Sequence, residues 1–131
     1  MKKIILDTNA YSRLMNGDKE VLNVISNSET IYFSVFVIGE LNAGFAGGKH
    51  EKKNHEILKE FLEKSSVKTL SATIETARIF GIIKNSLKQA ATPIPINDVW
   101  IASHCMETGA TLVSYDSHFK AVKGLLIWDS N

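Results

Sequence analysis

The stretch "KKIILDTN", residues 2–9, indicates the class of fold to which the chain belongs. Its centre, Ile4–Leu6, is a short apolar run with charged residues on both sides, which is typical of a strand buried in a parallel sheet. The residues that follow, "TNAYSRLMNG", predict a short helix that stops near Gly17. The chain therefore begins with a buried strand that leads directly into a helix.

The remaining sequence repeats this alternation of apolar runs and helical patterns. Such alternation predicts an α/β fold, with a central parallel sheet of about five strands flanked by helices. No linker or internal repeat divides the chain, so we expect a single domain over residues 1–131. Besides the first strand, we expect strands at 30–34, 67–70, 110–116 and 125–128, helices at 8–17, 18–26, 35–46 with Ser34 as cap, 50–64, 72–90 and 98–108, and a helical turn at 117–122.

Length and composition are those of one globular domain. The chain has 131 residues, of which 44% are hydrophobic and 22% charged, and the net charge of +1 does not by itself indicate a nucleic-acid partner. The single cysteine, Cys105, excludes an intramolecular disulfide and is expected in the core. No segment is long and apolar enough for a signal-peptide core or a membrane span, so we expect a cytoplasmic protein without a membrane partner.

Two acidic residues lie where predicted strands end. Asp7 ends the first strand, and Asp116 ends the fourth. Ligands of open parallel sheets bind outside the carboxyl ends of the strands, so both carboxylates are candidate site residues. The alternative is that both are ordinary turn residues, because Asp is common after strands.

Two further acidic residues interrupt the apolar faces of predicted helices. Asp98 stands at the head of a stripe formed by Ile101, Ala102 and Cys105, and Glu40 lies beside small and apolar residues. A carboxylate seldom faces a core without a partner. The alternatives are that Asp98 is a first-turn acid favoured by the helix dipole, with Asn97 as cap, and that Glu40 lies at a helix border.

Taken together, the four acids favour a metal site. Four carboxylates that converge on one sheet edge would repel each other without a counter-charge. Oxygen ligands of this kind suit Mg²⁺ or Mn²⁺, and such sites activate water and bind phosphate.

The order and spacing of these motifs resemble those of the PIN-domain ribonucleases, and in particular the VapC-like toxin subunit of the VapBC type II toxin–antitoxin systems. The resemblance covers essentially the whole chain. It rests on "ILDTN" at the start, "GEL" near residue 40, "NDVWIA" at Asp98 and "LVSYDSHF" near the end.

The resemblance implies a fold with strand order 3-2-1-4-5 and a complete acidic site. The family's four acidic positions correspond to Asp7, Glu40, Asp98 and Asp116, which would be the catalytic and metal-binding residues. Asp116 would bind a second metal or orient the attacking water. The supporting polar positions correspond to Thr8, Asn9 and Ser114.

The resemblance also implies an activity and partners. These are an endoribonuclease that depends on Mg²⁺ or Mn²⁺, a homodimer, and a small VapB-like antitoxin that occludes the site. Arg13 and Lys49 are the candidate contacts to RNA. We expect His104 on a helix surface, and His118 in a capping or packing role, although it could also touch phosphate.

Three other hypotheses compete with this one. "GFAGGKH" lacks the first Gly and the final Ser or Thr of a phosphate-binding loop. A phosphatase of the haloacid dehalogenase type would need a second Asp at position 9, where Asn9 stands. A catalytically silent domain of the same fold that binds RNA or protein remains the alternative function, and the intact acid set argues against it.

Overall fold

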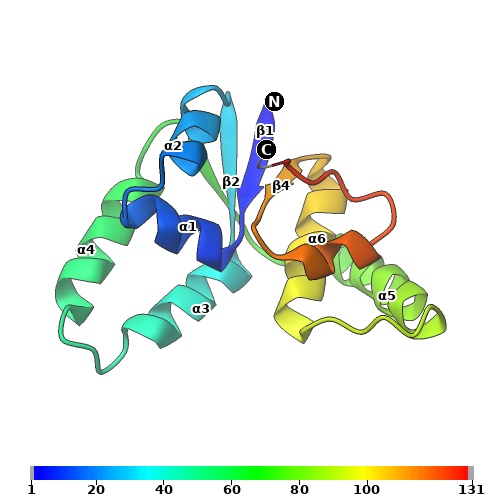
Figure 1. Cartoon of the computed structure of the whole chain (residues 1–131). Helices are drawn as coiled ribbons and strands as arrows, with labels where there is room; N and C mark the ends of the chain where they lie inside the picture. The colour runs from blue at the N-terminus through cyan, green and yellow to red at the C-terminus, as the bar shows by residue number, and fades with distance from the viewer. Residues whose placement is uncertain (1, 130–131) are drawn as a thin grey trace.

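The first strand forms the middle of a parallel sheet, as its apolar run predicts. In the computed structural model, which describes residues 2–129, β1 (Lys3–Leu6) pairs with β2 (Thr30–Ser34) on one side and with β4 (Thr111–Val113) on the other. β3 (Val67–Leu70) pairs with β2, so the order is β3-β2-β1-β4. Ile4, Ile5 and Leu6 have no exposed surface, because helices cover both faces of the sheet (Figure 1).

The prediction of a fifth strand needs correction. Residues 125–128 form only one parallel bridge, between Ile127 and Leu112, beside β4. The Leu112 N–H donates to the carbonyl of Leu126, and the Trp128 N–H donates to that of Leu112, each at 2.8 Å. β4 has only three residues, so it offers this segment little backbone to pair with. The predicted strand order is confirmed for four strands, and a single bridge stands in place of the fifth strand.

The helices lie where their apolar spacing predicts, in two layers. The helices are α1 (Thr8–Met15), α2 (Lys19–Ser26), α3 (Val35–Phe45), α4 (Glu51–Leu62), α5 (Ile74–Gln89) and α6 (Ile96–Thr108). The predicted helical turn is a 3₁₀ helix, η1 (Ser117–Ala121). Helices α1 to α4 lie on one side of the sheet, and α5 and α6 lie on the other (Figure 1).

The main core joins the sheet to α1 and α4 through aromatic rings. Tyr11, Phe33 and Phe61 make three edge-to-face pairs with ring centroids 5.3–5.4 Å apart. Cys105 is buried in the same core, as predicted. This packing fixes α1, and with it the first residues after β1.

α6 differs from its prediction at its start. It begins at Ile96, and its N-cap is Pro95 rather than Asn97. It ends as predicted at Gly109, whose φ of 72° is the left-handed conformation that glycine tolerates.

No helix in residues 2–129 combines the length and the apolar character needed to cross a membrane. Of the predicted domain, residues 1, 130 and 131 lie outside the described residues.

Candidate active site

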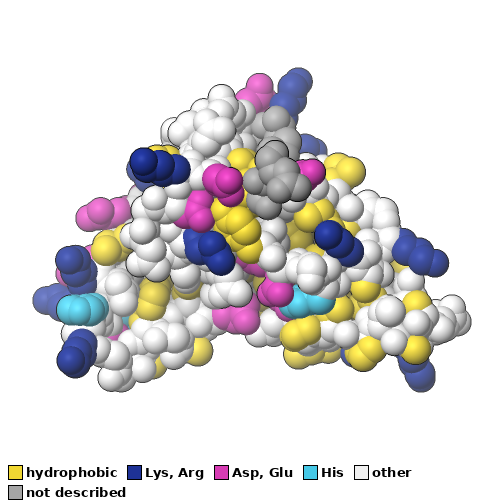
Figure 2. Space-filling model, in the orientation of Figure 1, with side chains coloured by type: hydrophobic (Ala, Val, Ile, Leu, Met, Phe, Trp, Pro, Cys, Tyr) yellow, Lys and Arg dark blue, Asp and Glu magenta, His cyan; other side chains and the backbone are white. Residues whose placement is uncertain are grey.

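Asp7 and Asp116 come together because their strands are neighbours. Leu6 is in register with Val113, and the Asp7 N–H donates to the Val113 carbonyl at 3.3 Å. The chain then continues from Val113 through Ser114 to Asp116 at the same edge. Acidic side chains gather in the middle of this face of the molecule, with basic side chains on both sides of them (Figure 2).

Asp7 has a structural role as well as a place in the site. Its Oδ1 accepts a hydrogen bond from the Ala10 N–H at 2.8 Å, so it is the N-cap of α1. Its Oδ2 accepts one from Ser114 Oγ at 2.5 Å. Burial raises the pKa of Asp7, the hydrogen bonds from Ser114 and Ala10 oppose that rise, and the charges of Asp98 and Asp116 add to it. The structural role of Asp7 is thus that of a helix cap rather than that of a turn residue.

Glu40 reaches the site from the middle of α3. Its Oε1 accepts a hydrogen bond from Thr8 Oγ1 at 2.6 Å, which joins α3 to the first residue of α1. α3 begins at the Ser34 cap, directly after β2, so the carboxyl end of β2 sets where Glu40 lies. Thr8 was predicted as a supporting residue, and its hydroxyl group orients the carboxylate of Glu40.

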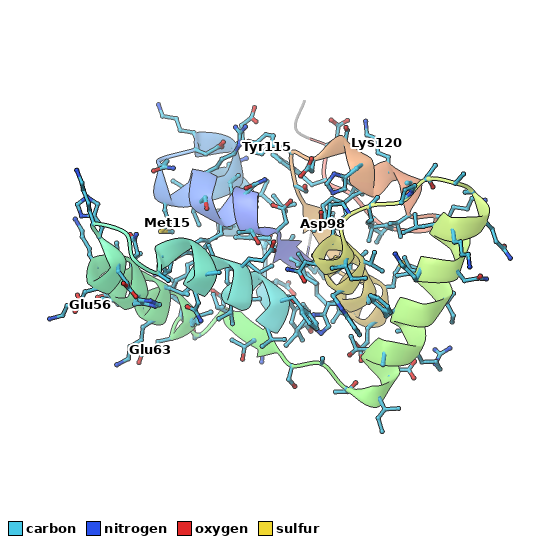
Figure 3. All side chains as sticks on the ribbon, turned by 90° about the horizontal axis from the view of Figure 1, so that it is seen from below. Met15, Glu56, Glu63, Asp98, Tyr115 and Lys120 are labelled. Carbon is cyan, nitrogen blue, oxygen red and sulfur yellow. The ribbon has the colours of Figure 1, made fainter. Side chains whose placement is uncertain are left out.

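Asp98 lies on the inward face of α6, as the helical spacing predicts. Ile101, Ala102 and Cys105 are almost completely buried, and the side chain of Asp98 is 17% exposed. Figure 3 shows Asp98 near the middle of the molecule, viewed from below. Burial raises the pKa of Asp98, a hydrogen bond and charge from His118 lower it, and the charges of Glu40 and Asp116 raise it.

His118 has contacts with two of the acids that the sequence analysis does not predict. Its Nε2 lies 2.7 Å from Asp98 Oδ2, and its Nδ1 lies 3.2 Å from Asp116 Oδ1. The predicted capping or packing role is therefore incomplete, because the imidazole stands between two of the four acids. The available signal was its position two residues after Asp116, inside the "LVSYDSHF" motif.

His104 is buried, and its predicted surface position is wrong. Only 1% of it is exposed. Its Nδ1 lies 2.9 Å from Ser34 Oγ, and its Nε2 lies 3.2 Å from the carbonyl oxygen of Ser71. Both partners lie at the ends of neighbouring strands, so an inward-facing histidine is satisfied there. Burial lowers the pKa of His104 and favours the neutral ring.

The two predicted RNA contacts differ in their placement. Arg13 lies with its guanidinium carbon 4.1 Å from the centre of the Tyr115 ring, and its Nη1 is 3.8 Å from Asp18 Oδ2. Together with Asn9 and Asp116, Arg13 lines a pocket of about 390 Å³ beside the acids. Lys49 is exposed in the turn between α3 and α4 and does not line that pocket.

The chemistry of the donors fits a hard divalent cation, although their present arrangement does not form a ready site. Within residues 2–129, no three or more His, Cys, Asp or Glu side chains are arranged so that they could hold a metal ion. Each of the four carboxylates instead accepts a hydrogen bond or pairs with a protein group, as described above. Carboxylate oxygens are the ligands that Mg²⁺ and Mn²⁺ prefer, and the mutual repulsion of the acids would favour such an ion.

Known proteins are similar to this chain in sequence and in architecture. Ribonuclease VapC2 from Rickettsia felis is 30% identical over 132 residues, which cover 95% of this chain and 97% of that protein. The crystal structure of VapBC2 from Rickettsia felis bound to a promoter DNA fragment contains a chain with 27% identity and a TM-score of 0.85, covering 96% of this chain and 97% of its own. For VapBC-1 from nontypeable Haemophilus influenzae, the identity is 25%, the TM-score 0.85 and both coverages 98%. Residues 4–125 match the model of the PIN domain family, so this chain belongs to that family.

Proposed function

We propose that this protein is an endoribonuclease toxin that requires Mg²⁺ or Mn²⁺ to hydrolyse RNA phosphodiester bonds. One observation carries the proposal: acids from four separate segments, after β1, in α3, in α6 and after β4, lie at one edge of the sheet. The electrostatic influence of Asp98 and Asp116 on Asp7, and of Glu40 on Asp98, supports their grouping in one site. The names of the relatives as ribonucleases support the reaction class.

In this proposal Asp7, Glu40 and Asp98 hold the cation. When bound, the cation would lower the pKa of a water molecule and stabilise negative charge on the phosphate. Ser114 and the Ala10 N–H orient Asp7, and Thr8 orients Glu40. Asp116, whose side chain is 43% exposed, lines the same pocket as Asn9 and Arg13, and in this proposal it orients the attacking water. Arg13 would bind a neighbouring phosphate of the RNA.

The direct test is cleavage of RNA by the purified protein. We expect single-stranded or looped RNA to be cut when Mg²⁺ or Mn²⁺ is added and to stay intact in excess EDTA. The Asp98→Asn protein, purified in parallel, is the control for contaminating nucleases. Full activity in EDTA after removal of trace metal would contradict the metal dependence, and equal activity of Asp98→Asn would contradict the site.

We also infer that an antitoxin restrains the protein in the cell. The structural relatives from Rickettsia felis and Haemophilus influenzae are VapBC complexes, which supports a VapB-like partner here. A cationic or hydrogen-bonding group of that partner, inserted among the four acids, would block the approach of phosphate.

Growth of cells that express this chain tests the restraint. The chain alone should arrest growth, and co-expression of the small gene next to it should restore growth. Asp7→Asn is the preferred inactive control, because Asn keeps the cap of α1 that Ala would remove. Harmless wild-type protein at confirmed soluble expression would instead favour the catalytically silent binding domain.

A further inference from the structure

Two pockets meet at Tyr115 and Asp116. One is the Arg13 pocket of about 390 Å³ described above, which α1 supplies on its other side. The second pocket, here called the η1 pocket, has about 410 Å³, and its lining includes Tyr115, Asp116, Ser117, Lys120, Ile127 and Trp128. Tyr115 and Lys120 lie at the same edge of the molecule (Figure 3). Because the two pockets share Asp116 and otherwise use different elements, they lie on two sides of this acid.

The two aromatic rings of the η1 pocket are held in place by distant parts of the chain. Tyr115 Oη lies 2.9 Å from Asp18 Oδ2 and 3.1 Å from Glu20 Oε2. The rings of Tyr115 and Trp128 pack edge to face, with centroids 5.4 Å apart. The Trp128 N–H donates to the Leu112 carbonyl at 2.8 Å, so the single bridge to β4 positions this ring. A ring that is already ordered binds a ligand at a lower entropic cost.

The lining of the η1 pocket has the chemistry that a nucleotide requires. Trp128 is only partly buried, and an indole face stacks on any nucleobase. Lys120 is exposed on η1 and offers a cation to a phosphate. The carboxylates of Asp116 and Asp129 repel a second phosphate but can accept hydrogen bonds from N–H groups of a base. The volume lies in the usual range of ligand pockets, about 300–1,000 Å³.

The position of the η1 pocket beside the acids indicates which nucleotide it would take. An enzyme that cuts inside an RNA chain must hold nucleotides on both sides of the cleaved bond. The Arg13 pocket serves one side in the function proposed above, and the η1 pocket is the cavity on the other side of Asp116.

We propose that the η1 pocket binds a nucleotide of the RNA next to the cleaved bond, with its base stacked on Trp128 and its phosphate paired with Lys120. This inference rests on the proposed ribonuclease function and adds a substrate-binding site to it. Binding of the base is independent of the metal, so it can be measured without cleavage.

The first test uses the fluorescence of Trp128. The chain has two tryptophans, and Trp100 stacks between Phe36 and Phe80, so Trp100→Phe keeps an aromatic ring there and leaves Trp128 as the sole fluorophore. A short single-stranded RNA of mixed sequence should quench this emission to saturation. The titration is made in EDTA and, with Asp98→Asn added, in Mg²⁺. Absence of quenching in both conditions would overturn the proposal, and this measurement does not require any change at Trp128.

The second test separates contacts to the base from contacts to the phosphate. Trp128→Ala should weaken binding of the RNA by roughly 5- to 150-fold, the range expected for loss of one base–aromatic stack. The same variant should hardly change binding of an abasic chain of equal length, whereas Trp128→Phe should keep most of the affinity for RNA. Lys120→Met should weaken binding of both chains equally. Fluorescence anisotropy of labelled chains measures these affinities.

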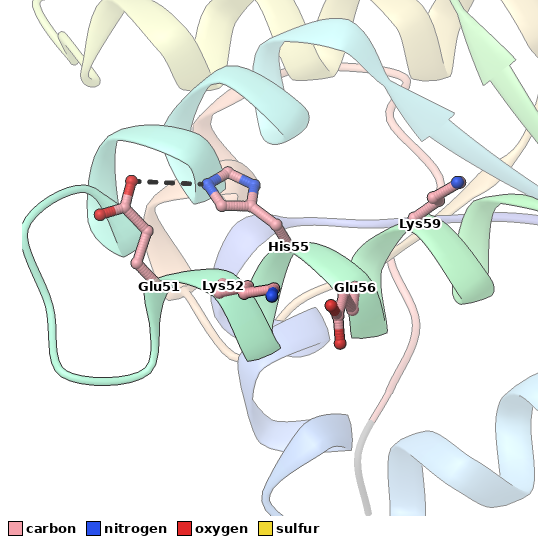
Figure 4. Close-up of a pocket in the computed structure, with 5 residues that line it drawn as sticks. All are labelled: Glu51, Lys52, His55, Glu56 and Lys59. Carbon is pink, nitrogen blue, oxygen red and sulfur yellow. Dashed lines mark ion pairs between the residues drawn. The ribbon is translucent and has the colours of Figure 1, made fainter.

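A lysine far from the η1 pocket supplies the matched control. Lys59 lies on α4 near Glu56 (Figure 4), and Figure 3 shows Glu56 and Lys120 at opposite ends of the molecule. The hollow that Lys59 lines is formed by α4 alone. Lys59→Met should bind both chains as wild type does. An equal loss of affinity in Lys59→Met and Lys120→Met would overturn the role of Lys120.

The outcomes distinguish this site from the proposed reaction. Quenching and base-dependent affinity in a protein that does not cut RNA would overturn the ribonuclease function and support the binding site. Cleavage by a Trp128→Ala protein that binds RNA as tightly as wild type would overturn the binding site and leave the ribonuclease function. If Trp128→Ala instead keeps its RNA affinity and loses rescue by the co-expressed small gene, the pocket binds the antitoxin, and the proposal is wrong.

Discussion

When no cation is bound, the negative charges of Asp7 and Asp98 lower the stability of the folded protein. Burial and neighbouring acids raise the pKa of both carboxyl groups in the folded protein. A raised folded pKa contributes stability that is fully present below the unfolded value and is lost as pH rises through the folded value. Near neutral pH these residues therefore favour unfolding, which is expected of residues that serve a ligand rather than the fold.

Asp98→Asn separates the chemical role of this side chain from a structural one. The amide keeps the shape and removes the charge, and the helix loses no cap, because Pro95 is the N-cap of α6. We expect cleavage to be lost, while the metal-free protein is as stable as wild type or more stable by roughly 1 kcal/mol, the scale of a one-unit pKa shift. Urea unfolding in EDTA measures this change. Marked destabilisation, with Asp7→Asn folding normally, would mean that Asp98 is a structural residue.

α3 and α6 carry Glu40 and Asp98, and His104 holds these two helices in a fixed relation. Ser34 Oγ accepts from the Phe36 N–H at 3.1 Å at the start of α3, and it also contacts His104 of α6. The other ring nitrogen of His104 faces the Ser71 carbonyl after β3. In the neutral ring, Nε2 donates to that carbonyl and Nδ1 accepts from the Ser34 hydroxyl. One buried side chain thus connects two helices and the end of a strand.

The lowered pKa of His104 predicts how its contribution to stability depends on pH. Burial lowers the folded pKa of His104 below its usual value of 6.5. A depressed folded pKa gives stability that is present above the unfolded value and is lost as pH falls through the folded value. The contribution of His104 to the free energy of unfolding should therefore fall as pH decreases below about 6.5, so the wild-type protein should lose more stability over this range than His104→Gln. An unchanged slope in His104→Gln would show that other groups cause it.

His104→Ala tests the connection itself. It leaves the buried Ser34 hydroxyl and the Ser71 carbonyl without their ring partner, and we expect a loss of about 2–3 kcal/mol in unfolding free energy. Denaturant unfolding at neutral pH measures this loss. A loss below about 0.5 kcal/mol, the usual range for surface substitutions, would mean that water replaces the ring at no cost.

At the scale of the whole molecule, large apolar side chains remain exposed on the helices that flank the site. Ile74 and Ile82 of α5 are 91% and 58% exposed, and Ile96 of α6 is 51% exposed. Single apolar residues on a surface are common, and these three do not form one patch, because the hydrogen bond from Thr76 to Glu107 places the start of α5 beside the end of α6, whereas Ile96 begins α6. The homodimer that the family resemblance implies would cover such residues.

We predict that the protein without an antitoxin is a homodimer whose interface includes Ile82 of α5. Size-exclusion chromatography with light scattering should give twice the 14.5 kDa of one chain. Ile82→Glu should shift the protein to the monomer, because it places a charge at that interface. Leu22→Glu, at a 53% exposed residue of α2, is the control and should not change the mass. A monomeric wild type at the same concentration would contradict the prediction.

Local patterns in the sequence determined most of the fold. Apolar runs at Ile4–Leu6 and 30–34, and helical spacing such as that of Asp98 with Ile101 and Cys105, depend on which faces are buried, and burial leaves its period in the sequence. The grouping of the four acids followed from strand ends, helix faces and the family resemblance. The fifth strand failed because its apolar run did not reveal that β4 has only three residues to pair with.

Only the tertiary structure decided how the acids are held. His118 meets Asp98 across 20 positions of the chain, Thr8 meets Glu40 across 32, and Ser34 meets His104 across 70. A histidine in an amphipathic pattern has the same local signature whether it faces solvent or a partner, because the partner belongs to another segment. Hydrophobic periodicity indicates which face of an element is buried. The packing of distant elements determines which polar group contacts that face.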